Sequence, residues 1–401
     1  MGFSSGAVTL KRFFVEGSLL DRVDESLLEK LAGHAMGQSD ETATDKTHCG
    51  WVTGEHILDT HFEWSKNVVG DGLHFALRID TNKPPADLVR SYQRMNEQAM
   101  LEASGRPFLS KVERREARDQ ATARADAEAE SGTFRRMKQV PVYWDFNRNE
   151  VYLGTAAASA VDRFLLLFRH TFDRGAVPAS AGELASRWAT KAGEGSALDN
   201  ARPACLVKPP EGAAEQDDAI IPGEPRSRDF LGTEWLTWLW YTSHVESADV
   251  AASQGHPVTV LFERCLQMEC AFKISGTTTI NADGPTRLPE SSVALASGKR
   301  PVRAGLHVAV HGDVYALTVR GDAMNFSGIR LPDPEDGADR RTAFESRVEH
   351  LRNLIQGIDA LYHAFLKRRL STKWPQTLGI LRNWVAGGAA PSKRAAELAV
   401  S

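Results

Sequence analysis

The segment from Leu306 to Arg330, LHVAVHGDVYALTVRGDAMNFSGIR, decides the fold class of this chain. It contains three runs with the composition of β-strands, and two Gly-Asp dipeptides, at 312–313 and 321–322, separate them. Glycine and aspartate adopt the backbone conformations of tight turns, so consecutive runs are expected to pair as antiparallel strands. The segment therefore predicts a β-meander with strands at Leu306–His311, Val314–Arg320 and Met324–Arg330.

Apolar helices are predicted on both sides of this meander in the sequence. After it, large apolar residues recur at intervals of four and three, the spacing of one continuous helical face. They are Phe344, Val348, Leu351, Ile355, Ile358, Tyr362 and Phe365. Before it, the run from Asp229 to Tyr241 holds Trp235, Trp238 and Trp240. This run is too short to span a membrane and predicts a buried helix.

Strands and helices also alternate in the first 190 residues, which predicts an α+β fold with mixed or antiparallel sheets and long amphipathic helices. Residues 191–227 are rich in Gly, Pro, Ala and acidic side chains and show little periodicity. We interpret them as a linker or surface insert. The expected organisation is therefore an N-terminal α+β domain at 1–190, the insert at 191–227, and a C-terminal α+β domain at 228–401.

Composition excludes several classes of protein. The chain has 401 residues, 42% of them hydrophobic and 25% charged, with a formal net charge of -4. These values exclude collagen, coiled-coil rods and a wholly disordered chain. No segment reaches the roughly 18 apolar residues of a membrane span, and the amino terminus lacks the pattern of a signal peptide. Four scattered cysteines form no disulfide framework, so we expect a cytoplasmic protein.

Residues 106–138 carry nine basic and six acidic side chains, and no large apolar residue lies between Val112 and Phe134. Abundant Ala, Glu and Arg favour helix. Such a helix would have nothing to bury and is expected to project into solvent or contact a partner. Its basic residues Arg114, Arg115 and Arg118 are candidates for phosphate contacts. Interleaved Glu113 and Glu116 leave a solvated, internally paired face as an equal alternative.

A second basic cluster, Lys299, Arg300 and Arg303, has no acidic residue from Ser291 through Arg303. It is the stronger candidate for DNA phosphates, which bind surfaces of clustered cations. A third cluster, at 367–373, follows the end of the predicted long helix, where basic side chains complement the helix dipole.

No familiar catalytic motif is present. The chain has no Walker loop, no G-x-G-x-x-G after a strand, no G-x-S-x-G and no H-E-x-x-H. We interpret His307 and His311 as sheet residues and Cys265 and Cys270 as small hydrophobes, so neither a metal nor a cofactor is predicted. A metal-dependent nuclease would need clustered carboxylates. The candidates Asp71, Asp80, Asp145 and Glu150 show no unifying spacing, and such residues are usually turn formers.

The chain resembles the RdgC family of recombination-associated DNA-binding proteins over most of its length. The resemblance in the first half rests on Cys49-Gly50-Trp51-Val52, Gly105-Arg106-Pro107 leading into 111–116, Tyr143-Trp144-Asp145, and 151–155. In the second half it rests on the Trp-rich segment 229–241, on Ser297–Leu306 with its glycine-lysine strand entry, and on the order of strands, acidic loop and long final helix. This chain is longer than the shorter members, mainly through 191–227 and 276–296.

The resemblance implies a head-to-tail homodimeric ring that binds double-stranded DNA through a positively lined hole, is associated with the nucleoid, and restrains RecA-driven recombination. The charged helices at 106–138 would then be candidates for the arms that close the ring. Among basic positions only Lys299 is carried over by its motif. The family has also borne an exonuclease label, which no carboxylate cluster in this sequence supports. A metal-dependent nuclease acting through Asp145 or Glu150 and a module that binds a recombinase are the alternatives.

Overall fold

The computed structural model of the chain describes residues 2–18, 24–38, 47–211, 224–334 and 337–387. These residues form an α+β fold with antiparallel strand ladders and long helices, as predicted. The chain divides into two compact units. Unit 1 comprises Met1–Glu16, Arg148–Ala156 and Ala176–Ser401, and unit 2 comprises Gly17–Asn147 and Ala157–Gly175. The units are therefore not consecutive along the chain. Of the predicted insert 191–227, residues 191–211 and 224–227 fall inside unit 1, and residues 212–223 lie outside the described part of the chain.

Unit 1 is built on one antiparallel sheet with the strand order β10-β9-β11-β12-β13-β1-β6. The predicted meander is confirmed as β11 (Lys299–Val310), β12 (Asp313–Arg320) and β13 (Asn325–Arg330). Strand β1 (Val8–Val15) pairs with β13 on one side and with β6 (Glu150–Leu153) on the other. The remaining strands are β9 (His256–Cys270), β10 (Thr278–Asn281), β8 (Asp249–Ser253) beside β9, and β7 (Ala176–Pro178) beside β1.

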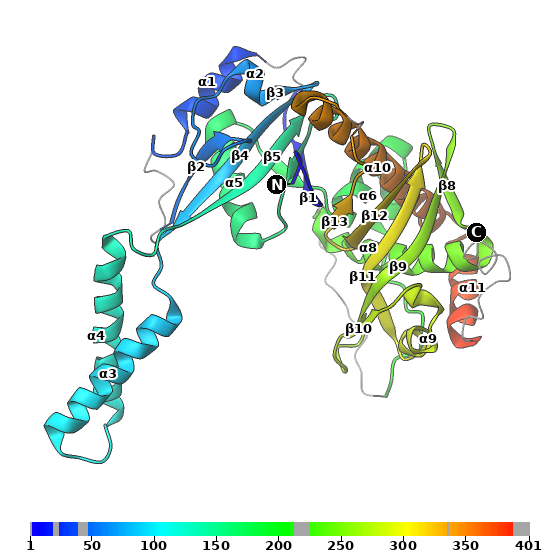
Figure 1. Cartoon of the computed structure of the whole chain (residues 1–401). Helices are drawn as coiled ribbons and strands as arrows, with labels where there is room; N and C mark the ends of the chain where they lie inside the picture. The colour runs from blue at the N-terminus through cyan, green and yellow to red at the C-terminus, as the bar shows by residue number, and fades with distance from the viewer. Residues whose placement is uncertain (1, 19–23, 39–46, 212–223, 335–336, 388–401) are drawn as a thin grey trace. The chain divides into compact units, whose positions relative to one another are not determined.

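Helices α8 (Phe230–Tyr241) and α10 (Arg340–Arg369) pack on one face of this sheet (Figure 1). Both were predicted, and the apolar faces of the two helices meet in the core. The Trp235 ring contacts Tyr362 edge to face, with centroids 5.6 Å apart, and neither side chain is exposed by more than 1%. Unit 1 also contains α6 (Ala181–Ala192), α7 (Gly195–Asp199), α9 (Pro289–Ala296), α11 (Trp374–Gly387), the short helices η1 (Pro225–Arg228) and η3 (Pro285–Arg287), and a π-helix, η2 (Thr242–Glu246).

A pair of glycines lets α8 lie against the turn between β12 and β13. A Cβ atom at Gly232 would lie 2.0 Å from the carbonyl oxygen of Gly321. Real Cβ atoms do not approach backbone so closely, so only glycine fits at this position. This backbone contact positions the three tryptophans of α8 over the sheet.

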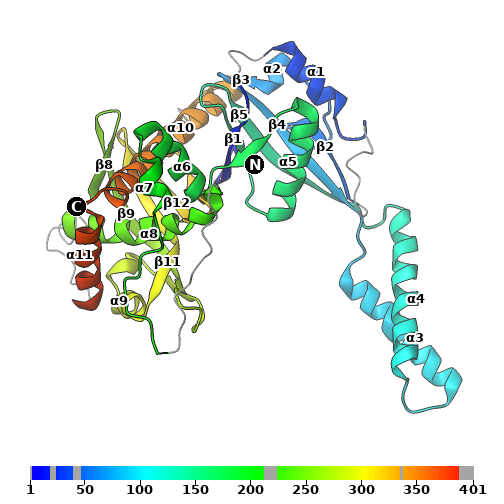
Figure 2. The ribbon, with the colours of Figure 1, turned by 180° about the vertical axis from the view of Figure 1, so that it is seen from behind.

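Unit 2 has a smaller antiparallel sheet in the order β5-β4-β2, with β3 (Val68–Val69) beside β4. Its strands are β2 (Thr47–Thr53), β4 (Gly72–Thr81) and β5 (Arg136–Asp145), and its shorter helices are α1 (Glu25–Gly33), α2 (Trp64–Asn67) and α5 (Ala158–Phe172). Aromatic rings of Trp51, Trp144 and Phe168 fill the core between sheet and α5. Helices α3 (Ala86–Ser104) and α4 (Lys111–Glu130) form an antiparallel helical hairpin that extends from the ends of β4 and β5 (Figure 2).

The structure corrects the prediction for 106–138 in two respects. Helix α4 does have a buried face, because Ala117, Ala121, Ala125 and Ala129 form a stripe, exposed by no more than 1%, along the side that meets α3. Its polar groups also bond α3: the Tyr92 hydroxyl donates to Glu128, at 2.5 Å. In addition, residues 136–138 belong to β5, because they pair with 79–81 of β4. None of the described helices is long and apolar enough to cross a membrane.

Candidate nucleic-acid interface

The predicted cations of α4 lie near the end of the helical hairpin that is remote from the sheet of unit 2. Helix α4 starts there with a capping box, in which the Glu113 amide donates to Ser110 Oγ (3.3 Å) and the Ser110 amide donates to the Glu113 carboxylate (2.8 Å). Arg106 also pairs with Glu113. These hydrogen bonds lower the pKa of the Glu113 carboxyl. Glu113 is therefore occupied in starting the helix and in holding the turn that precedes it.

Arg114 and Arg118 are exposed and have no ion-pair partner among the described residues, and the same is true of Lys111. Arg115 lies 3.9 Å from Asp119, a weak and exposed pair. The sequence allowed either free cations or cations paired with acidic residues of the same helix. Such pairing occurs at Arg115 but not at Arg114 or Arg118. Three cations within two helical turns remain available for an anionic partner.

Two exposed apolar side chains lie beside these cations. Phe108 and Val112 are each 75% exposed. Phe108 lies in the loop before α4 and Val112 in the first turn of the helix, so two large apolar side chains are exposed near the end of the helical hairpin. Neither residue was predicted from the sequence to be functional. The signal was a phenylalanine in the loop between two polar helices, with a valine at the start of the second.

The predicted cluster on β11 does not act as one patch. Lys299 donates from Nζ to the Gly276 carbonyl (2.8 Å) and to Thr278 Oγ1 (2.5 Å). Arg300 donates from Nη2 to the Ala204 carbonyl at 2.7 Å. Both side chains thus hold neighbouring segments of unit 1. Arg303 is exposed and has no ion-pair partner among the described residues, so it is the member of the cluster best placed to bind a ligand.

Arg303 lies on the face of the β11–β12–β13 meander opposite to α8 and α10. Side chains on this face are half-buried or exposed, whereas the alternate residues Leu306, Val308 and Val319 are buried. Arg330 of β13 is on the same open face, is exposed, and has no ion pair within the described chain. On the central strand β12, Arg303 is paired with Arg320 and Arg330 is paired with Ala316. The Cα atoms of Arg303 and Arg330 are therefore two strand spacings and four residues apart, which is about 16 Å.

Arg320 shares this face but is already neutralised. Its Nε and Nη2 atoms donate to Asp322, at 2.9 and 3.2 Å. Arg330 was missed in the sequence analysis because it stands alone rather than in a basic run. A strict period of two in the predicted strand Met324–Arg330 would group it with the buried Met324 and Phe326. Arg330 reaches the open face because the register with β12 shifts by one residue between Ser327 and Arg330, which no local pattern predicts.

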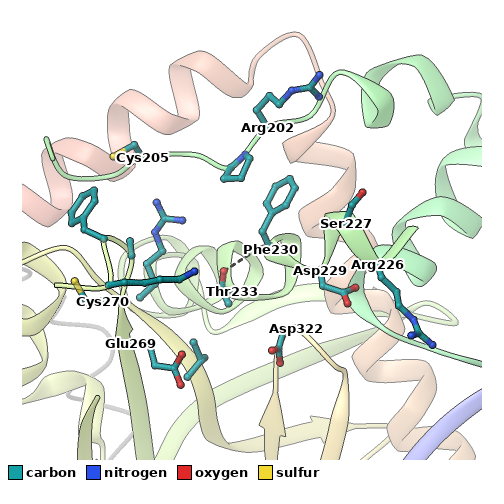
Figure 3. Close-up of a pocket in the computed structure, with 16 residues that line it drawn as sticks. Arg202, Cys205, Arg226, Ser227, Asp229, Phe230, Thr233, Glu269, Cys270 and Asp322 are labelled. Atoms are coloured by element: carbon teal, nitrogen blue, oxygen red, sulfur yellow. Dashed lines mark hydrogen bonds between the residues drawn. The ribbon is translucent and has the colours of Figure 1, made fainter. Parts of the chain in front are cut away.

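A cavity of about 870 Å³ lies beside Arg300. Figure 3 shows Asp229, Glu269 and Asp322 on one side and Cys205 on the segment that crosses the other. Two of the acidic side chains that line the cavity already have partners. Asp322 accepts from Arg320, and Asp229 accepts from the Gly182 amide at 2.9 Å. Burial and the charge of Asp322 raise the pKa of Asp229. The lining therefore has no clear preference for an anionic or a cationic ligand.

Cys270 also lines this cavity. Burial raises the pKa of its thiol, but the Ser275 hydroxyl and the amides of Phe272, Ile274 and Ser275 donate to the sulfur and bring that pKa to about 7. The thiol thus ionises more readily than that of Cys49, whose pKa burial raises to about 11. Of the two cysteines interpreted as small buried hydrophobes, Cys270 is buried, with 9% exposure, whereas Cys265 is only half-buried.

The carboxylates considered for a nuclease are held in separate structural contacts. Asp80 accepts two bonds from Arg78, at 2.7 Å each, and further bonds from Arg135. Glu150 accepts from Arg12, Arg148 and Tyr152. Asp145 is fully buried. Within the residues that the structure describes, no three His, Cys, Asp or Glu side chains are arranged to hold a metal ion.

No protein-family model matches the chain, and no curated protein matches it.

Proposed function

We propose that this chain is a non-catalytic protein that binds duplex DNA without sequence preference. The observation that supports it is the set of exposed cations that lack an ion-pair partner, Lys111, Arg114 and Arg118 on α4 and Arg303 and Arg330 on the open sheet face. Duplex DNA carries one charge per roughly 1.7 Å of its axis, so cations about 16 Å apart on a sheet can each contact a phosphate. A net charge of -4 is compatible with such local positive surfaces.

The resemblance to the RdgC family supplies the wider part of the proposal. The chain would form a homodimeric ring around DNA and restrain RecA-type recombination by occupying the duplex, in the nucleoid of the cytoplasm. The helical hairpin would be the arm that closes the ring. Phe108 and Val112 at its end offer an apolar contact for a second copy.

Fluorescence anisotropy of a labelled 30-base-pair duplex, in a salt series without magnesium, tests DNA binding. We expect tight binding that weakens steeply with salt and does not depend on sequence. The variant Arg303→Glu/Arg330→Glu should weaken binding to all duplexes alike and reduce the slope of log affinity against log salt by about 2. Lys367→Glu on α10 is the matched control, because this exposed cation belongs to a helix on the opposite face of the sheet.

Three results would redirect the proposal. Absence of binding at low salt would remove duplex DNA as the ligand. Loss of the labelled duplex on addition of magnesium, abolished by Asp145→Asn, would favour the nuclease alternative. Capture of a recombinase in the absence of nucleic acid would favour the protein-interaction alternative.

A further inference from the structure

A second cavity in unit 1, of about 600 Å³, takes no part in the proposed DNA surfaces. Residues of β1, β6, α6 and α10 and the segment before β6 line it. They include Arg12, Arg148, Glu150, Arg187, Lys191 and Asp359. Four cations and two carboxylates among these residues give the lining a formal charge of +2, with Glu183 beside Arg187 as a further acid outside the lining.

The two carboxylates are already satisfied by two arginines. Asp359 accepts from Arg12 at 2.7 and 3.1 Å and from Arg148 at 3.1 Å. Glu150 accepts from Arg12 at 3.0 Å, from Arg148 at 3.3 and 3.4 Å, and from the Tyr152 hydroxyl at 3.0 Å. Burial raises the pKa of Asp359, but the charges of Arg12 and Arg148 outweigh burial and hold it below its usual value. The floor of the cavity is thus a closed, neutral network.

Donors remain around this network. Arg12 is only 2% exposed, and its buried Nε–H has no hydrogen-bond partner in the described chain. This atom has essentially no solvent-accessible surface, so the donors that remain open to a ligand are those of Arg187. Arg187 uses Nε for Glu183, at 2.6 Å, and its guanidinium carbon lies 3.8 Å from the Phe14 ring centroid. Its two terminal amino groups have no hydrogen-bond partner in the described chain.

Lys191 is one helical turn after Arg187 on α6, is exposed, and has no ion pair among the described residues. The two side chains therefore present positive charge along the same side of the cavity. Trp188 adds a half-buried indole beside them. An arginine and a lysine beside a partly enclosed space are the usual protein ligands of phosphate.

We propose that this cavity binds the phosphate group of a small phosphorylated molecule, with Arg187 and Lys191 as its charged ligands and Trp188 as a flat wall for the rest of the molecule. The cavity volume lies within the ordinary range for small-molecule sites. The lining shares no residue with the proposed DNA surfaces, and so the inference does not depend on the proposed function.

Isothermal titration of the full chain with pyrophosphate, adenosine 5′-monophosphate and adenosine tests this site. We expect the two phosphate-bearing probes to bind and adenosine not to bind. Arg187→Ala/Lys191→Ala should raise the dissociation constant tenfold or more, because two charge-assisted contacts are lost. Lys191→Met alone should raise the dissociation constant less, and it leaves the contact of Arg187 with Phe14 intact. Lys208→Ala, an exposed cation outside the cavity, should bind as the unaltered chain does.

Equal binding by the double variant, or no binding of either phosphate probe at millimolar concentration, would overturn the proposal. Displacement of the probe by duplex DNA, together with weaker duplex binding by Lys191→Met, would also overturn it, because the cavity would then belong to the DNA surface. Probe binding by a chain that fails to bind duplex would support this site and reject only the proposed function.

Discussion

Helices α4 and α8 bury opposite kinds of surface. Helix α8 has 12 residues and buries ten of them, including Trp235, Trp238 and Trp240. Helix α4 has 20 residues and buries only four of its six alanines. A large apolar side chain stabilises a helix through the area that it removes from water, whereas alanines stabilise α4 by letting α3 approach closely. The comparison shows that a helix of almost entirely polar sequence can still have a specific packing partner.

The largest expected difference between the two helices lies in the cost of truncation. Trp235→Ala should lower the free energy of unfolding by about 3–5 kcal/mol, because a fully buried indole leaves a cavity against Tyr362. Chemical denaturation followed by circular dichroism would measure this. Trp64→Ala is the control, since that indole is 48% exposed and should change stability little. A small effect at Trp235 would mean that α8 is not a core helix.

A pH-dependent effect of intermediate size is expected just after α8. Burial and the nearby charge of Arg287 lower the pKa of His244 to about 4. The unfolded chain takes up this proton near pH 6.5 and the folded chain does not, so the free energy of unfolding should fall as the pH drops from about 6.5 to 4. At about 1.4 kcal/mol per unit of pKa, the full change over about 2.5 units is roughly 3–4 kcal/mol.

The variant His244→Asn should show a flatter dependence of stability on pH over this window. His56→Asn, which replaces an exposed histidine, serves as the control. An unchanged pH profile in His244→Asn would assign the acid sensitivity to another group. Helix α4, with its exposed charges, should contribute little to the profile.

On the hairpin, enlarging a buried alanine should separate the helices. Ala121→Leu should destabilise α3 and α4 by about 1–2 kcal/mol, because the added side chain has no space at a fully buried position. Ala123→Leu makes the same change on the exposed side of the same helix and should be neutral. Hydrogen exchange of the backbone amides of α3 and α4 would distinguish the two variants, with faster exchange expected only in Ala121→Leu. Equal exchange in both variants would show that the alanine stripe has no packing role.

The smallest expected effect is at the start of α4. Ser110→Ala removes the hydroxyl of the capping box and should cost about 1 kcal/mol, again detected as faster amide exchange in the first turn of α4. Thr122→Ala, in the exposed middle of the helix, should change that turn little. If Ser110→Ala also left the exchange unchanged, the packing of alanines alone would define where the helix begins.

This comparison also explains which features the sequence could predict. The helices α8 and α10 were predicted because large apolar side chains report their buried faces directly. The stripe of α4 was missed because alanine is equally common on exposed helix faces, so its spacing at 117, 121, 125 and 129 carried little weight. Residues 136–138 are too polar to suggest a strand and become one only by pairing with β4.

The residues of the candidate site can likewise be divided into those that local sequence could predict and those that depend on distant segments. The exposure of Arg303 follows from alternation along a strand, which is a local property, whereas that of Arg330 depends on the shifted register between β13 and β12. The roles of Lys299 and Arg300 depend on carbonyl groups at Gly276 and Ala204, far away in the sequence, and no local pattern could reveal them. The cavity around Lys191 likewise combines segments from residue 12 to residue 363.

The pairing of β1 between β13 and β6 has a consequence for synthesis of the chain. Val8 pairs with Ile329, so β1 finds one of its neighbours only after about 320 further residues have been made. Unit 2 is complete at Gly175 and can fold on the ribosome well before then. The first segment of unit 1 must therefore wait, with one strand edge open, while the rest of its sheet is translated.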